Sequence, residues 1–591
     1  MSQVEKEGAW KPNCNCKEHN EVTPLSTFGR RDFLRSAAAI TVGAMASPLL
    51  ASSAYGDSMH RAGMLRSGAV MAGKAQIATI LHTADIHGQL YTHDEFFVED
   101  GQVVYKKRGG LAVLKTMLNK LRAENPSNTL LIDGGDCFQG SGVAALSEGR
   151  ALVPLMNNIA YDLVLPGNWE VAYKKEMMIS DLSGYTAAKI CANMFHKSAD
   201  DQKGDIIFKP YWTKTLGGIK IGFVGYTDHN IPKRQPPAYS KGIHFTNPLD
   251  DVAKYIKILK EDEQCAMVFL VTHFGLAQQV NLANKPEVQG TDFILGADTH
   301  ERVRSPIVGK YAQVTEPGAF GSFVSRLDLV IEDGVVKDKN YELLDVDPTK
   351  YKADREMARL IEKERAPFKK SLDTVIGECK IPLVRYYVME TPMDNMITDA
   401  LMWKFKPDIA LSNGFRFCPP LVPDRKTGTA LITMDYLWSM LPINSEVKSA
   451  SIPGSQIWDW LERELHNVFA KDPGERLGGW VVRMQGLHFN FTMYNEFGKR
   501  LNWVTVNSQP LELTRTYTMV ACEREGDPDT TLCRLVNVIK PASLNVTMHQ
   551  AVIEYLKVHS PVSPRVEGRV TATDAPPTLL SQLEGYGYSF F

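Results

Sequence analysis

Short apolar segments of strand length alternate with longer amphipathic segments over residues 76–346, and this alternation restricts the fold more than any other feature. The apolar segments are residues 77–84, 129–134, 163–166, 221–225, 267–272 and 293–296. Between them, residues 111–124 and 248–263 carry apolar side chains at three- and four-residue spacing, which is typical of amphipathic helices. The alternation of such strands and helices predicts an α/β domain with largely buried strands.

Nearly every predicted strand ends in a polar side chain that can bind a metal ion. In chain order these side chains are Asp85, His87, Asp136, Asn168, His273, Asp298 and His300. Because the carboxyl ends of strands line the ligand crevice of an open α/β sheet, we expect these groups to converge. Carboxylate and amide oxygens with imidazole nitrogens suit divalent ions. Taken singly, each residue is also explained as a helix cap or a hydrogen-bonded histidine, but the ordered series predicts a metal site.

The motifs around these endings resemble those of the 5′-nucleotidase family of calcineurin-like metallophosphoesterases. They read Asp85-Ile86-His87-Gly88, Gly135-Asp136-Cys137-Phe138-Gln139-Gly140, Gly167-Asn168-Trp169-Glu170, Thr272-His273-Phe274-Gly275 and Ala297-Asp298-Thr299-His300. Looser matches to the family's C-terminal domain follow in order, at Glu390-Thr391 with Asn395, Asn413-Gly414-Phe415-Arg416, Leu441-Pro442-Ile443-Asn444 and Gly478-Gly479. The resemblance covers about residues 76–570 and implies a four-layer α/β/β/α metallophosphoesterase domain followed by a 5′-nucleotidase-type α/β domain.

The resemblance also implies how the side chains would hold two metal ions. Asp85, His87 and His300 would hold one ion. Asn168 and His273 would hold the other, and Asp136 would bridge both. Asp298 replaces the first histidine of the family's G-H-x-H motif, and a carboxylate can take that ligand place. We expect two manganese ions, with zinc as the alternative that the ligand types leave open.

Two departures from the family pattern bear on the substrate. Trp169 stands where the family has the histidine of G-N-H-E, and Ala172 stands where the acidic partner of that histidine is expected. The aromatic pair that stacks a nucleobase is also missing, because Ile443 and Gly526-Asp527-Pro528 occupy its positions. Trp169 could wall a narrow passage to the ions, or it could simply pack beneath the ligands.

Gly-Asn-Trp-Glu on this scaffold is similar to the thiosulfohydrolases (sulfate thiol esterases) of bacterial thiosulfate oxidation. That resemblance implies release of sulfate from a cysteine S-sulfonate or S-thiosulfonate on a SoxYZ-type carrier protein with a cysteine-bearing arm, by attack of a metal-bridged hydroxide on the sulfonate sulfur. A thiol has a pKa of about 8.5, so its thiolate can leave without being protonated. An alkoxide leaving group needs a general acid to protonate it. The candidate catalytic residues are Trp169, Asn168 and Arg416; an interdomain ion pair is the other interpretation of Arg416.

Two other functions remain open from the sequence. One is a nucleotide phosphohydrolase of the parent family, for which a nucleobase clamp would be the discriminating feature. The other is a non-catalytic metal-binding interaction protein, which bound metal with measurable turnover would exclude.

The N-terminal residues predict export. Residues 29–35 read Gly-Arg-Arg-Asp-Phe-Leu-Arg, which resembles a twin-arginine signal. The apolar run that follows is shorter than the ~20 residues that span a bilayer. We expect a signal peptide at 1–54 that engages the twin-arginine export machinery, delivery to the periplasm, and no membrane insertion. The further boundaries that we expect are a linker at 55–75, the metal domain at 76–346, a linker helix at 347–373, the second domain at 374–573 and a tail at 574–591.

Composition excludes some partners and one type of scaffold. The 66 basic and 68 acidic residues give a net charge of −2, so no general basic field attracts nucleic acid or an anionic membrane. The nine cysteines are too sparse for a disulfide scaffold. Cys522 and Cys533 are the nearest pair in the expected mature chain, and whether they bond is open.

Overall fold

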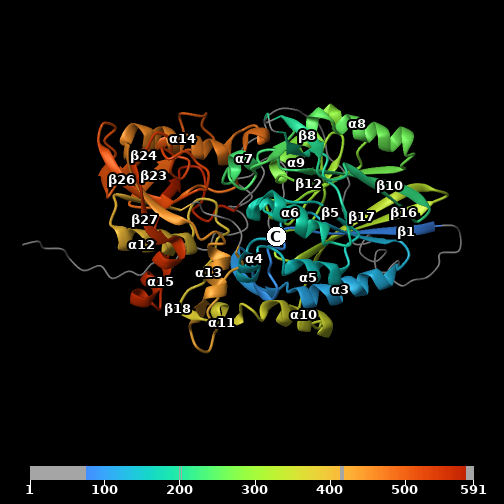
Figure 1. The fold of residues 1–591 in the computed structure, drawn as a ribbon, viewed down its shortest axis with the longest axis horizontal. Helices are drawn as coiled ribbons and strands as arrows, with labels where there is room; N and C mark the ends of the chain where they lie inside the picture. The colour runs from blue at the N-terminus through green and yellow to red at the C-terminus, as the bar shows by residue number, and fades with distance from the viewer. Residues whose placement is uncertain (1–74, 199, 201, 413–417, 581–591) are drawn as a thin grey trace, which may run out of the picture. The chain divides into compact units, whose positions relative to one another are not determined.

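The computed structural model describes residues 75–198, 200, 202–412 and 418–580, so the predicted signal peptide and Arg416 lie outside the described residues. Two six-stranded sheets form the first domain (Figure 1). In spatial order, one sheet contains β17 (Val335–Asp345), β16 (Phe323–Glu332), β1 (Ala75–Thr83), β4 (Thr129–Asp133), β5 (Leu163–Val164) and β6 (Ala188–Lys189). The other contains β14 (Ile307–Val308), β15 (Gln313–Thr315), β13 (Phe293–Leu295), β12 (Met267–His273), β10 (Ile219–Thr227) and β9 (Tyr211–Leu216).

The inner strands of the second sheet, β10, β12 and β13, are buried on both faces. On one face, the Phe269 ring stacks between Phe223 and Phe293 with centroid distances of 5.4 and 5.6 Å, and all three belong to the main core of the first domain. On the other face, residues such as Val224 and Val268 pack with side chains from α8 (Val252–Lys257) and α9 (Leu276–Ala283). Because successive side chains of a strand point to opposite faces, each strand reads as a continuous apolar run.

Helices on the outside of the first sheet complete the domain. The buried side chains of α3 (Leu111–Glu124) and α5 (Leu152–Ile159) join the same main core as β1 and β4. The predicted four-layer α/β/β/α domain is therefore confirmed, and α3 has the bounds that the sequence predicted. The remaining helices of this domain are α4 (Gly142–Ser147), α6 (Lys174–Ser183) and α7 (Ile231–Arg234). A small sheet contains β11 (Ile243–Phe245), β7 (Met194–Lys197) and β8 (Lys203–Ile206).

Three local features differ from the sequence-based expectation. The helix expected at 248–263 is a 3₁₀ turn (Pro248–Asp250), then α8, then a π turn (Ile258–Asp262). The expected linker helix is two helices, α10 (Arg355–Arg365) and α11 (Lys369–Leu372), and α10 begins only where the Asp354 side chain accepts the Met357 N–H. The hairpin of β2 (His93–Glu99) and β3 (Gln102–Arg108) was not predicted, although the Asp-Gly pair at its turn is a hairpin signal.

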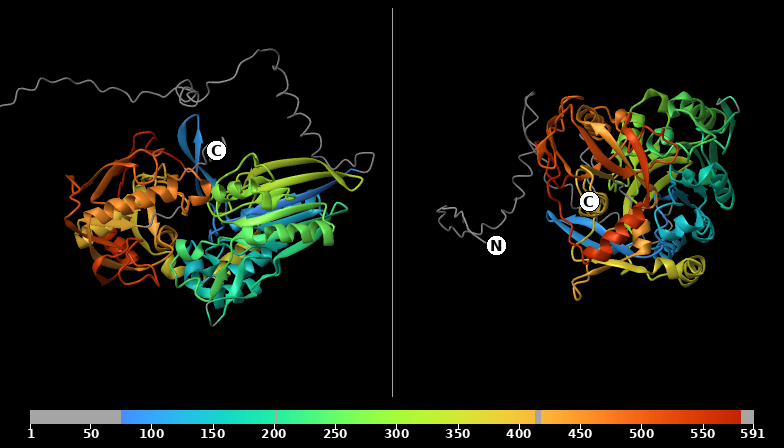
Figure 2. Two further views of the ribbon diagram at one scale, coloured as in Figure 1. Left: turned by 90° about the horizontal axis from the view of Figure 1, so that it is seen from above. Right: turned by 60° about the vertical axis from the view of Figure 1, so that its left-hand side comes forward.

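The second domain is also α/β, as predicted. Its five-stranded sheet contains β22 (Arg483–Gln485), β19 (Ile409–Ser412), β26 (Thr516–Cys522), β21 (Glu446–Pro453) and β27 (Ile539–Thr547). A four-stranded sheet contains β25 (Gln509–Pro510), β24 (Leu501–Val506), β23 (Leu487–Phe491) and β28 (Val570–Ala572), and a pair is formed by β18 (Val375–Cys379) and β20 (Ala430–Thr433). The helices are α12 (Pro392–Phe405), α13 (Met434–Met440), α14 (Gly454–Phe469) and α15 (Met548–His559), and further views are given in Figure 2.

No helix in the described part of the chain has the length and apolar character needed to cross a membrane. No disulfide forms between any of the cysteines that the structure describes, Cys522 and Cys533 included.

Candidate metal centre

The predicted ligands lie in loops at the carboxyl ends of strands from both sheets. Asp85 and His87 follow β1, Asp136 follows β4, His273 is the last residue of β12, and His300 follows β13. All five side chains are buried. The sheet ends therefore bring together residues, such as His87 and His300, that are 213 positions apart in the chain.

Backbone strain is concentrated at these positions. Asp85, His87, Asp136, Asp298 and His300 all have positive φ angles, of 53°, 48°, 61°, 93° and 65°. Each such residue costs about 1–3 kcal/mol, so the surrounding structure must hold these loops in place. Strain of this kind clusters at functional sites.

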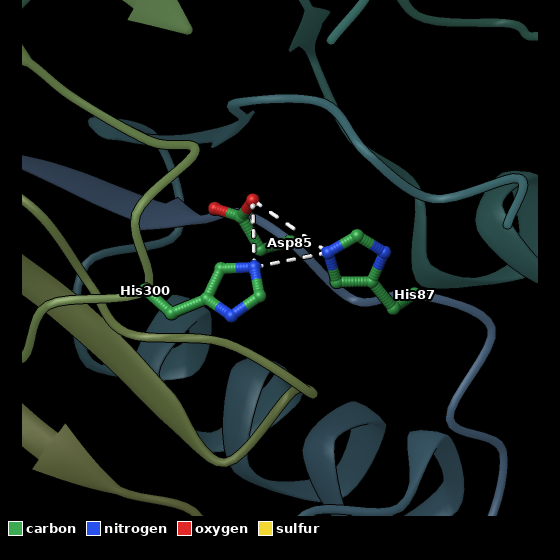
Figure 3. Close-up of side chains that lie close together, drawn as sticks. All are labelled: Asp85, His87 and His300. Atoms are coloured by element: carbon green, nitrogen blue, oxygen red, sulfur yellow. Dashed lines mark hydrogen bonds and ion pairs between the residues drawn. The ribbon is translucent and has the colours of Figure 1, made fainter. Parts of the chain in front are cut away.

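Asp85, His87 and His300 form the first ligand group (Figure 3). The Nε2 atoms of His87 and His300 are 3.0 Å apart, and Asp85 Oδ1 lies 3.4 Å from His300 Nε2 and 3.9 Å from His87 Nε2. His87 Nδ1 donates to the Gln139 carbonyl at 2.8 Å, which leaves Nε2 as the nitrogen that faces the group.

Asp85, Asp136 and His273 form the second ligand group. His273 Nε2 is 3.1 Å from Asp136 Oδ2 and 3.9 Å from Asp85 Oδ1, while His273 Nδ1 donates to the Gly134 carbonyl at 2.7 Å. Asp85 is thus the residue common to both groups, whereas the sequence-based prediction gave the shared place to Asp136. Asp136 Oδ2 does lie 3.9 Å from His87 Nε2, so this carboxylate also stands next to both groups.

The donor atoms of these groups fit divalent metal ions. Asp85 Oδ1 and His273 Nε2 are buried and have no hydrogen-bond partner among the described residues. Burial raises the pKa of the Asp85 carboxyl to about 7. The positive charge of nearby histidines opposes this rise, and the negative charge of nearby carboxylates adds to it. Buried polar groups left without partners are costly unless an ion completes them. The two groups therefore constitute a dinuclear metal site with Asp85, His87, Asp136, His273 and His300 as candidate ligands.

Asn168 and Asp298 lie beside the second ligand group but bind other side chains. Asn168 Nδ2 donates to Asp298 Oδ1 at 2.6 Å. Arg234 Nη2 donates to both carboxylate oxygens of Asp298, at 3.1 and 2.9 Å. Asp298 Oδ1 is 4.0 Å from His273 Nε2, and Asp298 belongs to neither ligand group. A carboxylate bound by a guanidinium is already neutralised, so direct coordination by Asp298 stays a prediction.

Glu170 has a role that sequence reasoning missed. Its buried carboxylate accepts the N–H groups of Asp136, Cys137 and Gly167, at 2.9, 2.6 and 2.7 Å. Burial raises the pKa of Glu170 to about 7, with the Asp136 charge acting in the same direction. Glu170 therefore braces the two loops that carry Asp136 and Asn168. The only sequence signal was its place in the Gly-Asn-Trp-Glu motif.

Two adjoining clefts open beside the ligand groups, and both domains line them. The larger has a volume of about 980 Å³ and is lined by residues that include Asp298, Phe274, Lys471, Arg476 and Leu477. The smaller, of about 580 Å³, is lined by residues that include Asn168, Trp169, Trp480 and Arg534. Arg234 borders both. Among the described residues, no histidine lines either cleft.

Comparison with known families identifies this architecture. Residues 78–302 match the calcineurin-like phosphoesterase family, and residues 375–523 match the 5′-nucleotidase C-terminal domain. The chain belongs to the 5′-nucleotidase family of calcineurin-like metallophosphoesterases. It is a hydrolase of that family, with the dinuclear site in the first domain.

Several sequence relatives are named for activity on nucleotides. The trifunctional nucleotide phosphoesterase YfkN of Bacillus subtilis is 25% identical over 545 residues, covering 83% of this chain and 34% of that protein, so the chain spans about a third of this relative's length. Other relatives are named 5′-nucleotidases.

Two solved structures share the fold. The sulfate thiohydrolase SoxB of Thermus thermophilus in complex with glycerol has a TM-score of 0.74 at 20% identity, covering 86% of this chain and 99% of that chain. A 5′-nucleotidase precursor of Thermus thermophilus has a TM-score of 0.72 at 22% identity, covering 85% of this chain and 100% of that chain.

Proposed function

We propose that this protein is a manganese-dependent hydrolase that releases sulfate from a cysteine S-sulfonate or S-thiosulfonate on a SoxYZ-type carrier arm, after twin-arginine export to the periplasm. The observation that carries the proposal is the environment of Trp169. Its backbone N–H donates to Asp136 Oδ1 at 2.7 Å, so it stands directly beside the second ligand group. Trp169 is buried in the main core and is also among the residues that line the smaller cleft, where no described residue supplies an imidazole acid.

The region expected to hold a nucleobase clamp supports the same proposal. Ile443 packs against the core of the first domain and is not among the residues that line either cleft. The Glu525 carbonyl accepts the Ala238 N–H at 3.1 Å, and Gly526 lies against Ala238. These positions are therefore taken up by packing between the domains. Each base–aromatic stack is worth about 1–3 kcal/mol, so a nucleotide would lose the stacking energy of a clamp at these two positions.

The proposed reaction suits a site where, among the described residues, no histidine lines the clefts to act as general acid. Water adds its oxygen to the sulfonate sulfur, the S–S bond breaks, and its electron pair leaves on the carrier sulfur as a thiolate or persulfide, while sulfate and protons are released. A thiolate departs without protonation, since the pKa of a thiol is about 8.5. An alkoxide from a nucleotide ester needs an acid, whose absence costs about 10²–10⁴-fold in rate.

The residues of this chain would bind and orient rather than react. Divalent ions held by the two ligand groups would supply an activated water and would neutralise charge on the sulfonate oxygens. Glu170 holds the Asp136 loop, and the Trp169 indole restricts access from the smaller cleft. Lys471 and Arg476 line the larger cleft and would attract an anionic group. Arg416 is proposed as a further cation for the sulfonate.

A nucleotide phosphohydrolase is the second candidate function. The names of the sequence relatives favour it, and the ligand groups would serve either reaction.

Oxygen-18 labelling tests the proposal and separates it from the alternatives. The full chain, loaded with Mn²⁺, is incubated in ¹⁸O-water with a peptide that carries an S-sulfonated cysteine. We expect sulfate with one ¹⁸O atom and a free thiol on the peptide. Asp136→Asn should abolish this release, while Asp262→Asn, at an exposed position, should not. Phosphate from AMP without sulfate would support the nucleotidase, and no turnover despite bound manganese would support a non-catalytic protein.

A further inference from the structure

A chain of polar contacts leads from the ligand groups to the loop after β10. The Asn168 amide is held at both ends, because Nδ2 donates to Asp298 at 2.6 Å and Oδ1 accepts from Gln235 Nε2 at 3.1 Å. Asp298 accepts from Arg234, as described above. Arg234 Nη1 in turn donates to Asp228 Oδ2 at 2.8 Å. The guanidinium of Arg234 is therefore fixed by two carboxylates.

The segment that carries Arg234 and Gln235 is held by the second domain. Arg524 Nη2 donates to the Gln235 carbonyl at 2.6 Å, and the Ala238 N–H donates to the Glu525 carbonyl at 3.1 Å. The Arg524 side chain is 11% exposed, so this contact is largely withdrawn from water. A loop of the second domain thus fixes the backbone from which two residues reach Asn168.

The direction of these hydrogen bonds decides which end of Asn168 can bind a cation. An ionised Asp298 only accepts hydrogen bonds and Arg234 only donates them. The nitrogen of the Asn168 amide must therefore face Asp298. The amide oxygen keeps one lone pair beyond the bond from Gln235, and this is the atom that can bind a metal ion.

We propose that Arg234 is a positioning residue that fixes the Asn168 amide through Asp298, and that Arg524 holds Arg234 and Gln235 in place from the second domain. The affinity of the second ion position then depends on both domains. The first ligand group reaches the second domain by another route, since the Gln139 carbonyl accepts from His87 and Gln139 Nε2 donates to the Pro442 carbonyl at 2.6 Å. The proposal rests on the dinuclear site and does not depend on which substrate is cleaved. Partners of this outer kind are typically worth about 10–100-fold in metal affinity.

Manganese titration of the full, ion-free chain tests this proposal without using activity. For Arg234→Met we expect the second Mn²⁺ to bind about 10–100-fold more weakly, while the first is unchanged. Arg524→Met should act in the same direction with a smaller effect. Arg150→Met is the matched control, because Arg150 pairs with Glu148 on the surface and their side chains are 57% and 50% exposed.

A double-mutant cycle separates positioning from a general structural effect. If Arg234 acts through Asn168, Arg234→Met should add little to the loss already caused by Asn168→Ala. Gln235→Met removes one donor and serves as the second variant if Arg234→Met fails to fold. The proposal is overturned if the second ion binds to Arg234→Met or Gln235→Met as it does to the parent chain. It is also overturned if both ions weaken equally, or if the losses in the cycle simply add.

Discussion

The buried charges of the two domains differ in how completely they are paired. In the first domain, Asp85 Oδ1 and His273 Nε2 are buried without a hydrogen-bond partner among the described residues. In the second domain, Asp394 Oδ1 accepts from Arg385 Nε and Nη2 at 3.0 and 2.8 Å, and Asp394 Oδ2 accepts from Thr391 at 2.7 Å. Burial of charge is common to both places. The difference is that both carboxylate oxygens of Asp394 accept hydrogen bonds, whereas Asp85 Oδ1 is left for a metal ion.

Glu390 extends this contrast to a motif that the sequence placed in the family's C-terminal domain. Its carboxylate accepts from Asn395 Nδ2 at 2.6 Å and from the backbone N–H groups of Glu567, Gly568 and Arg569 at 2.7–2.9 Å. Thr391 caps α12 by accepting the Asp394 N–H. These motif residues hold α12 and the segment before β28 together, so in this structure they have a structural role.

The largest effect expected from this contrast is that of Asp85→Asn. Because Asp85 belongs to both ligand groups, the variant should lose both ions, and activity should fall by about 10²–10³-fold or more. The ion-free variant should unfold no more readily than the ion-free parent chain, since a neutral amide replaces a buried carboxyl whose Oδ1 has no hydrogen-bond partner among the described residues. Elemental analysis and chemical denaturation measure the two effects. If Asp85→Asn retained both ions, Asp85 would not be a ligand common to both groups.

Asp394→Asn should have the opposite pattern. Removing one partner of a buried ion pair typically costs about 3–5 kcal/mol, because Arg385 is left buried without its carboxylate. The folded variant should keep both metal ions. Urea denaturation and elemental analysis measure these quantities, with Asp529→Asn as an exposed control in the same domain. If Asp394→Asn lost metal ions while its free energy of unfolding stayed unchanged, the distinction between the paired Asp394 carboxylate and the ligand groups would be wrong.

The smallest effect concerns His549, a neutral buried group of the second domain. Burial lowers the pKa of His549 to about 4, although its Nε2–H donates to the Leu441 carbonyl at 2.7 Å. A lowered folded-state pKa contributes stability that is fully present above the unfolded value of 6.5 and is lost as the pH falls through about 4. The free energy of unfolding should therefore fall by at most about 1.4 kcal/mol per pH unit in that window.

His549→Gln should flatten this part of the pH profile, whereas His559→Gln, at an exposed position, should not. Denaturation midpoints measured between pH 7 and pH 4 would show the difference. An unchanged slope in His549→Gln would mean that another buried group causes the acid sensitivity.

The fold and much of the site could be predicted because they depend on local sequence patterns. Apolar runs fixed β1, β4 and β12, and the polar residues after them pointed to one edge of the sheets. The spacing of apolar residues gave α3 its bounds. Asn168, Asp85 and Asp136 could be predicted as candidate ligands for the same reason.

The remaining features depend on side-chain directions and long-range contacts that no sequence pattern records. Asp85 belongs to both ligand groups, and Asp136 Oδ2 lies 3.1 Å from His273 Nε2 and 3.9 Å from His87 Nε2, so a bridging place for Asp136 stays a prediction. The pairing of Arg234 with Asp298 joins residues 64 positions apart, and Arg524 reaches Gln235 from another domain. No sequence motif predicts these pairings, because arginine and glutamine are common on protein surfaces and their partners are far away in the chain.

A direct competition between two substrates tests the central proposal. The manganese-loaded full chain would be given an S-sulfonated carrier arm and AMP at equal concentration, and sulfate and phosphate would be measured over time. The replacement of the family's histidine by Trp169, and the lack of aromatic residues at Ile443 and Gly526-Asp527-Pro528, predict that sulfate release has the higher kcat/KM by at least about 10²-fold. Faster release of phosphate from AMP would contradict the account.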